Sequence, residues 1–129
     1  MNLRFYDDGL EKELRINLES MAEYVMHLYS LNKECDDQFV EERKKAARAT
    51  IKDMRALVCS HYIKYPETGF YGEYLQEVQP TMSKLRKQKT EKAKEEFKKL
   101  DIIKDSIRCG KRTADQYLKN RVQEDEIFA

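Results

Sequence analysis

The sequence predicts an all-α protein, and three observations support that fold class. Apolar residues recur at steps of three and four over long stretches, which is the spacing of one helix face. Only four Gly and two Pro occur in 129 residues, too few for the many turns of a β-rich fold. Charged residues make up 38% of the chain, a share typical of helices with solvated faces.

The first helix is expected from about Asp8 to Asn32. An apolar stripe runs along it through Leu10, Leu14, Leu18, Met21, Val25 and Leu28. Asp36 or Asp37 can cap a second helix that extends to about Tyr65. Its stripe comprises Ala47, Ile51, Met54, Val58 and Tyr62. Because the two helices are similar in length and joined by a short polar link, they predict an antiparallel helical hairpin.

Turn-forming residues separate this hairpin from the rest of the chain. Residues 66–69 read Pro-Glu-Thr-Gly, and a short helix is expected over Tyr71–Val78. Pro80 then divides that helix from a long, charged connecting helix over Met82–Lys99. The connecting helix has few apolar residues and is expected to be solvated, with pairs such as Glu91 and Lys94 on its surface. The sequence therefore predicts two regions. Residues 1–79 form a helical hairpin, and residues 80–129 form a basic helix with a C-terminal motif.

The C-terminal motif lies between Leu100 and Val122. Apolar residues stand at the offsets that let two short helices share a small core: Ile103, Ile107, Cys109, Ala114, Tyr117 and Leu118. Gly110 can supply a turn between the two helices, and Thr113 and Ala114 open the second. Over these residues the sequence resembles the helix-turn-helix and winged-helix DNA-binding families.

The resemblance implies a recognition helix from Lys111 to about Val122 that lies in the major groove of double-stranded DNA. Its exposed face would carry Lys111, Arg112, Asp115, Gln116 and Lys119, with Thr113 at the N-terminus of the helix. Arg112 would bond guanine and Gln116 adenine, while the two lysines and Thr113 would contact phosphates. This hypothesis describes a small DNA-binding regulatory or accessory protein of microbial or phage type.

The charge distribution favours the same hypothesis. Between Lys84 and Arg121 there are 14 Lys and Arg against 6 Asp and Glu, a local excess of +8 in a chain whose net charge is +1. Clustered positive charge attracts polyanions such as nucleic-acid backbones. A solvated helix face explains the same charges without any ligand.

An alternative hypothesis is a helical protein-interaction module, an inhibitor or adaptor that binds no nucleic acid. Five aromatic residues crowd the bend after the second helix, namely Tyr62, Tyr65, Phe70, Tyr71 and Tyr74. They fit either a docking surface for a protein partner or a plug of core residues. A homodimer is also expected if one hairpin leaves its apolar stripes partly uncovered.

Other classes of function lack the residues they need. No catalytic site, cofactor motif or metal site is expected, because Cys59 and His61 have poor ligand geometry and no phosphate-binding glycine loop occurs. Three widely spaced cysteines fit reduced thiols and a cytoplasmic location. Neither a membrane-spanning run nor a signal peptide is recognisable.

Overall fold

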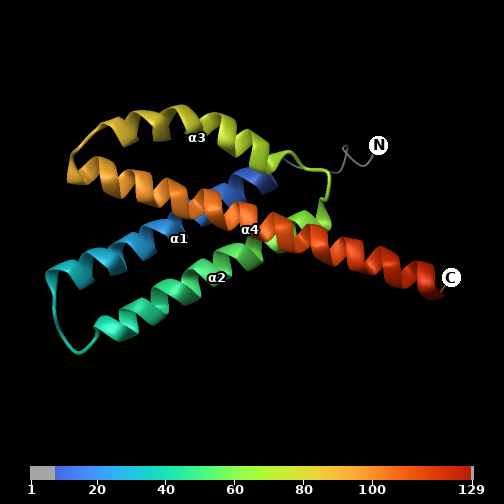
Figure 1. Cartoon of the computed structure of the whole chain (residues 1–129), viewed down its shortest axis with the longest axis horizontal. Helices are drawn as coiled ribbons and strands as arrows, with labels where there is room; N and C mark the ends of the chain where they lie inside the picture. Colours follow the sequence, from blue (N-terminus) through green and yellow to red (C-terminus); the bar gives the residue numbers. More distant parts are fainter. Residues whose placement is uncertain (1–7, 129) are drawn as a thin grey trace.

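The computed structural model describes residues 8–128 and contains four α-helices and no strand in that range. The helices are α1 (Asp8–Glu34), α2 (Val40–Lys64), α3 (Phe70–Lys87) and α4 (Glu91–Phe128) (Figure 1). The all-α class predicted from the sequence is therefore confirmed. None of the described helices combines the length and the apolar character needed to cross a membrane.

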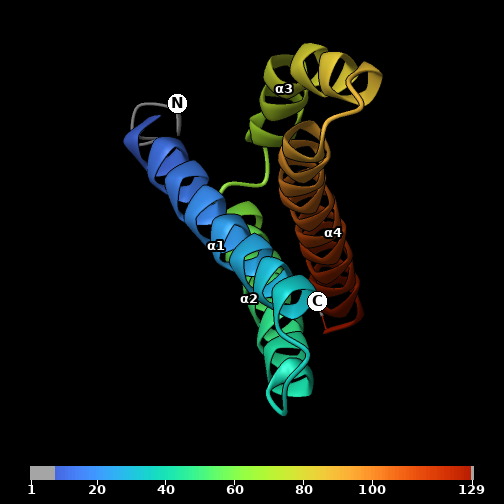
Figure 2. The ribbon, with the colours of Figure 1, turned by 90° about the vertical axis from the view of Figure 1, so that its left-hand side faces the viewer.

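The four helices form two hairpins that cross each other. α1 and α2 lie side by side in both views, and α4 packs mainly against α2 while α3 folds back along the first part of α4 (Figures 1 and 2). The apolar stripes of the first hairpin are consequently covered by helices of the same chain. The observation that suggested a homodimer, an uncovered stripe, is thus absent from the described residues.

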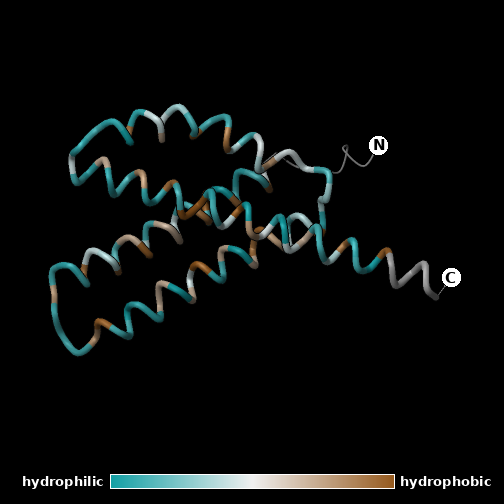
Figure 3. The backbone as a smooth tube through the Cα atoms, viewed as in Figure 1, coloured by the Kyte–Doolittle hydropathy of each residue, from teal (hydrophilic) through white to brown (hydrophobic). Residues whose placement is uncertain are grey.

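The main core lies where the helices cross, and all four helices contribute to it (Figure 3). From α1 and α2 it includes Leu18, Met54 and Val58, which are fully buried. Ile103 and Ile107 of α4 are also fully buried. Burying side chains of this size contributes roughly 1.5–3 kcal/mol each, so this crossing is the main source of stability.

Helix α3 continues through Pro80, where the sequence predicted a break. Val78 and Met82, on either side of Pro80, are both buried in the core, and this packing offsets the hydrogen bond that proline cannot donate. The break occurs instead at residues 88–90. There Gln88 adopts an extended conformation, and the Thr90 hydroxyl accepts a hydrogen bond from the Ala93 amide at 3.1 Å.

Two further expectations change as a result. The connecting helix predicted over Met82–Lys99 is divided between α3 and α4, which pack as a hairpin rather than as one solvated arm. The boundary expected between residues 79 and 80 falls inside α3, and the core includes residues from both sides of it.

Helix α4 is unbroken from Glu91 to Phe128, so the turn predicted at Gly110 is wrong. No described glycine has a positive φ. Ile103, Ile107, Gly110 and Ala114 are all buried and follow one another at steps of three and four. Continuous packing of this stripe against the other helices keeps α4 straight where two short helices were expected.

Candidate functional site

The six residues predicted to contact DNA lie on one stretch of α4. Arg112, Thr113, Asp115, Gln116 and Lys119 are exposed, and Lys111 is half-buried. Five of the six are thus exposed, and the backbone that carries all six is one continuous helix. With no turn at Gly110, the stretch is not a separate recognition helix placed by a preceding short helix.

Several of these polar side chains have partners within the chain. The Lys111 ammonium lies 2.8 Å from an Asp115 carboxylate oxygen and 5.8 Å from the centre of the Tyr62 ring. The Thr113 hydroxyl donates to the Cys109 carbonyl at 3.0 Å. The Gln116 amide donates to the Asn120 side chain at 3.1 Å. These contacts stabilise α4 and its packing on α2.

The last part of α4 extends beyond the other three helices (Figure 1). We call residues 115–128 the α4 overhang; at about 1.5 Å per residue it is roughly 20 Å long. Ala114, immediately before it, is the last core residue of α4 among the side chains that the structure describes, which end at residue 122. Tyr117 is 47% exposed and Val122 is 55% exposed, whereas Leu118 is half-buried.

The apolar residues of the overhang share one side of the helix. At about 3.6 residues per turn, Tyr117, Leu118 and Val122 fall on the same half of the helical circumference, and Arg121 falls between Tyr117 and Leu118. Lys119 borders Val122 at the edge of this side and is exposed. Exposed aromatic, aliphatic and arginine side chains together are typical of protein interfaces.

The aromatic bend predicted as a possible docking surface belongs largely to the core. Tyr62, Phe70 and Tyr74 are buried, and Tyr65 and Tyr71 are half-buried. The Tyr62 hydroxyl accepts a hydrogen bond from the Tyr71 amide at 2.7 Å, and burial raises its pKa to about 12. These rings close the end of the first hairpin. The bend therefore fits the interpretation as a plug of core residues better than that of a docking surface.

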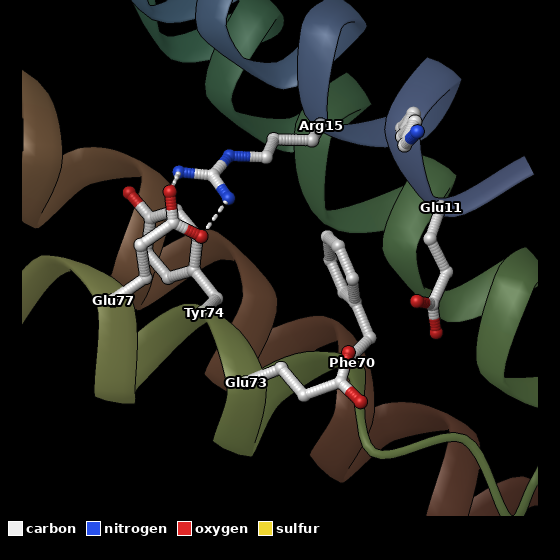
Figure 4. Close-up of a pocket in the computed structure, with 7 residues that line it drawn as sticks. Glu11, Arg15, Phe70, Glu73, Tyr74 and Glu77 are labelled. Carbon is white, nitrogen blue, oxygen red and sulfur yellow. Dashed lines mark hydrogen bonds and ion pairs between the residues drawn. The ribbon is translucent and has the colours of Figure 1, made fainter. Parts of the chain in front are cut away.

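A cavity of about 310 Å³ lies between α1 and α3 (Figure 4). Arg15 binds the Glu77 carboxylate through two nitrogens, one of them at 2.9 Å, and its guanidinium carbon lies 5.4 Å from the centre of the Tyr74 ring. The hydrogen bonds from Arg15 lower the pKa of Glu77. On the opposite side, Glu11 accepts a hydrogen bond from the Thr68 hydroxyl at 2.5 Å.

The charged groups of this cavity link α1 to the α3 region. Two of its three glutamates, Glu11 and Glu77, are held by Thr68 and Arg15. The described residues of the lining are Glu11, Lys12, Arg15, Phe70, Glu73, Tyr74 and Glu77. We therefore interpret the cavity as a structural contact between helices.

The side chains that commonly bind metal ions do not gather into a metal site in the described part of the chain. Among the described side chains, those of residues 9–122, no group of three or more His, Cys, Asp or Glu is placed to hold a metal ion. The cysteines are free thiols, with Cys35 exposed and Cys59 and Cys109 half-buried. His61 packs beside Tyr65 and Phe70, with ring centres 5.3 and 5.8 Å away, and burial lowers its pKa.

A comparison with protein-family models, curated proteins and solved structures found no match for this chain. Its function therefore has to be inferred from its own surfaces. The exposed large apolar side chains of the described residues are those of Ile16, Tyr24, Phe39, Leu57, Tyr117 and Val122, and the last two share one side of the α4 overhang.

Proposed function

We propose that this protein is a helical interaction module whose α4 overhang docks into an apolar groove on a protein partner. The observation that carries the proposal is the continuation of α4 past the bundle with Tyr117 and Val122 exposed. Single exposed apolar residues are ordinary on protein surfaces. Here they share one side of a helix that projects from the bundle, which is the usual arrangement for helix-in-groove recognition.

The fold itself gives little reason for this projecting segment. Isolated helices shorter than about 12–15 residues are marginal in water, because helix nucleation is unfavourable without packing. Among the side chains described, those up to residue 122, the core includes none of α4 beyond Ala114. A partner that covers Tyr117, Leu118 and Val122 would add packing to this segment.

The side chains of the overhang indicate the chemistry of the groove. Arg121 lies between Tyr117 and Leu118 on the apolar side of the helix and is exposed. Tyrosine and arginine are residue types that dominate binding energy at interfaces. The overhang as a whole contains two cations and four carboxylates, so its contacts are expected to be apolar with a polar rim. The partner we propose is thus a protein with an apolar groove for a single helix.

The test begins by placing a photo-crosslinking residue at Val122 in cells that express the protein. The matched control carries the same residue at Ile16 of α1, which is 61% exposed but lies on the bundle. A partner crosslinked only from position 122 is then purified, and its affinity is measured for the full chain and for variants. Tyr117→Ala and Val122→Asp should each weaken binding at least about tenfold, whereas Ile16→Ala should not.

Two results would overturn the proposal. The first is a partner that binds a chain ending at Gln116 as tightly as it binds the full chain. The second is sedimentation at twice the mass of the 15.4 kDa chain, abolished by Val122→Asp, because the overhang would then be covered by a second copy.

A further inference from the structure

A dense cluster of cations surrounds the junction of α3 and α4. We call residues 84–94 the basic turn; they contain one carboxylate, that of Glu91. The cations of the basic turn are all exposed, and they are Lys84, Arg86, Lys87, Lys89, Lys92 and Lys94. Glu95 and Glu96 follow directly, so the densest positive charge lies at this end of the α3–α4 hairpin.

Most of these cations have no partner in the described part of the chain. Lys94 pairs with Glu91 at 3.7 Å, and the Arg86 guanidinium carbon lies 5.3 Å from the centre of the Phe97 ring. The side chains without an ion pair, hydrogen bond or ring contact to the described side chains of residues 9–122 are those of Lys84, Lys87, Lys89 and Lys92.

Cations farther along α4 differ in this respect. Lys99 pairs with Glu23 at 2.8 Å, and Lys104 pairs with Asp101 at 3.8 Å. Arg108 pairs with Asp105. The positive charge in the middle of α4 is therefore largely balanced within the protein, whereas that of the basic turn is not.

Helix electrostatics explain only half of the cluster. Lys84, Arg86 and Lys87 lie in the last turn of α3, where cations interact favourably with the helix dipole. Lys89 and Lys92 flank the N-terminus of α4, where the dipole favours anions and disfavours cations. A bound anion at this position would interact favourably with both the lysines and the helix terminus.

The backbone of the basic turn is well fixed by local contacts. The Gln88 amide donates to the Leu85 carbonyl at 3.1 Å, and the Thr90 hydroxyl accepts from the Ala93 amide at 3.1 Å. The Arg86 contact with Phe97 joins the two helices on either side. Because little backbone ordering would be needed on binding, the charges are arranged in advance for an extended anion.

We infer that the basic turn binds the phosphate backbone of a nucleic acid, without reading its sequence. Phosphate contacts need only cations and polar donors. Insertion into a membrane or a protein groove needs exposed apolar side chains. In the basic turn Leu85 is half-buried and Ala93 is buried, and the remaining side chains are polar or charged. Nucleic acid is therefore the polyanion that the surface fits best.

This site lies at the opposite end of α4 from the α4 overhang (Figure 1). It does not depend on the proposed protein partner, and either interaction can be tested without the other. It also differs from the DNA-contact residues predicted from the sequence, which begin at Lys111.

The test measures binding of the full chain to a duplex DNA and a duplex RNA of about 20 base pairs as salt rises from about 50 to about 200 mM. The triple variant Lys87→Gln, Lys89→Gln and Lys92→Gln removes three charges from the basic turn. The matched control Arg112→Gln, Lys119→Gln and Arg121→Gln removes three exposed charges from the region predicted by the helix-turn-helix resemblance. The first variant should reduce the slope of log affinity against log salt by about 3, and the control by less than about 1.

A second variant separates charge from folding. Lys87→Arg, Lys89→Arg and Lys92→Arg keeps the charge and should keep the affinity within about threefold, since these phosphate contacts require only charge. Equal losses from the glutamine variant and its control would overturn the inference, because binding would then follow overall charge. Absence of binding to both duplexes at the lower salt, or tighter binding to phosphatidylserine vesicles or polyglutamate, would also overturn it.

Discussion

Val58 of α2 occupies the space that a side chain at Gly110 of α4 would need. A Cβ atom built on Gly110 would lie 2.7 Å from the Val58 Cβ and 2.7 Å from the Arg55 carbonyl oxygen, closer than real Cβ atoms come. α2 and α4 therefore approach each other closely at a residue without a side chain. The glycine serves the crossing of two helices and does not form a turn.

Gly110→Ala should accordingly destabilise the protein. Alanine is intrinsically better than glycine in a helix by about 1 kcal/mol. The clash with the Arg55 backbone and the Val58 Cβ cannot be relieved by rotating a side chain, so α4 must shift. We expect the free energy of unfolding to fall by about 1–3 kcal/mol, measured by urea denaturation.

Gly72 provides the matched control, because it also lies inside a helix but is exposed. A Cβ atom at Gly72 would meet nothing within 4 Å. Gly72→Ala should raise the free energy of unfolding by about 0.5–1 kcal/mol. If both substitutions stabilise the protein, α2 and α4 do not cross as closely as described.

The sequence predicted the parts of the fold that depend on repeated local patterns. Leu14, Leu18 and Val25 were placed on one stripe of the first helix, and all three are buried. Met54 and Val58 were placed on the stripe of the second helix and are fully buried. A stripe is visible in sequence because helix geometry repeats at short intervals, whichever element covers it.

The parts that were mispredicted depend on contacts between distant segments. Gly110 is compatible with a turn or with a close helix crossing, and only Val58, 52 positions earlier in the chain, decides between them. Pro80 lies inside α3 because its neighbours pack in the core. Thr90 offered a local signal for the start of α4, since threonine is a favoured residue at helix N-termini, and this signal was overlooked.

The ion pair between Arg15 and Glu77 joins α1 to α3 and should depend on pH. Both side chains are partly exposed, so we expect a coupling of no more than about 1 kcal/mol in a double-mutant cycle with Arg15→Met and Glu77→Gln. Because Arg15 lowers the pKa of Glu77, this stabilisation is present above the unfolded value of 4.5 and is lost as pH falls below it. Denaturation at pH 7 and at about pH 3 would measure the change.

The pair Lys44 and Glu41 serves as a control, because it lies within one helix and is more exposed. Its coupling should be about 0.3–0.5 kcal/mol at pH 7. A coupling between Arg15 and Glu77 that is unchanged at about pH 3 would contradict an origin in the charged carboxylate.

His61 should make the protein less stable in mild acid. Burial lowers the pKa of its imidazole, so the unfolded chain binds a proton at a higher pH than the folded chain does. Stability is therefore greatest above the unfolded value of 6.5 and decreases as pH falls from there toward the folded pKa. Denaturation between about pH 7.5 and about pH 5 should show the decrease, and His61→Gln should reduce it.

His27 is the other histidine of the chain and is exposed on α1. His27→Gln controls for the loss of an imidazole at the surface. The pH dependence of this variant should match that of the unmodified protein. If His27→Gln removes the decrease and His61→Gln does not, the packing of His61 against Tyr65 and Phe70 is not its cause.

The α4 overhang should be dispensable for folding, and this separates its role from that of the core. Val122→Asp changes an exposed position and should alter the free energy of unfolding by less than about 0.5 kcal/mol. Ile107→Ala, fifteen positions earlier on the same helix, opens a cavity in the core and should cost about 2–5 kcal/mol. Urea denaturation of both variants measures the difference. A large loss of stability from Val122→Asp would mean that the chain itself covers this surface, which would leave no exposed apolar side for a partner to bind.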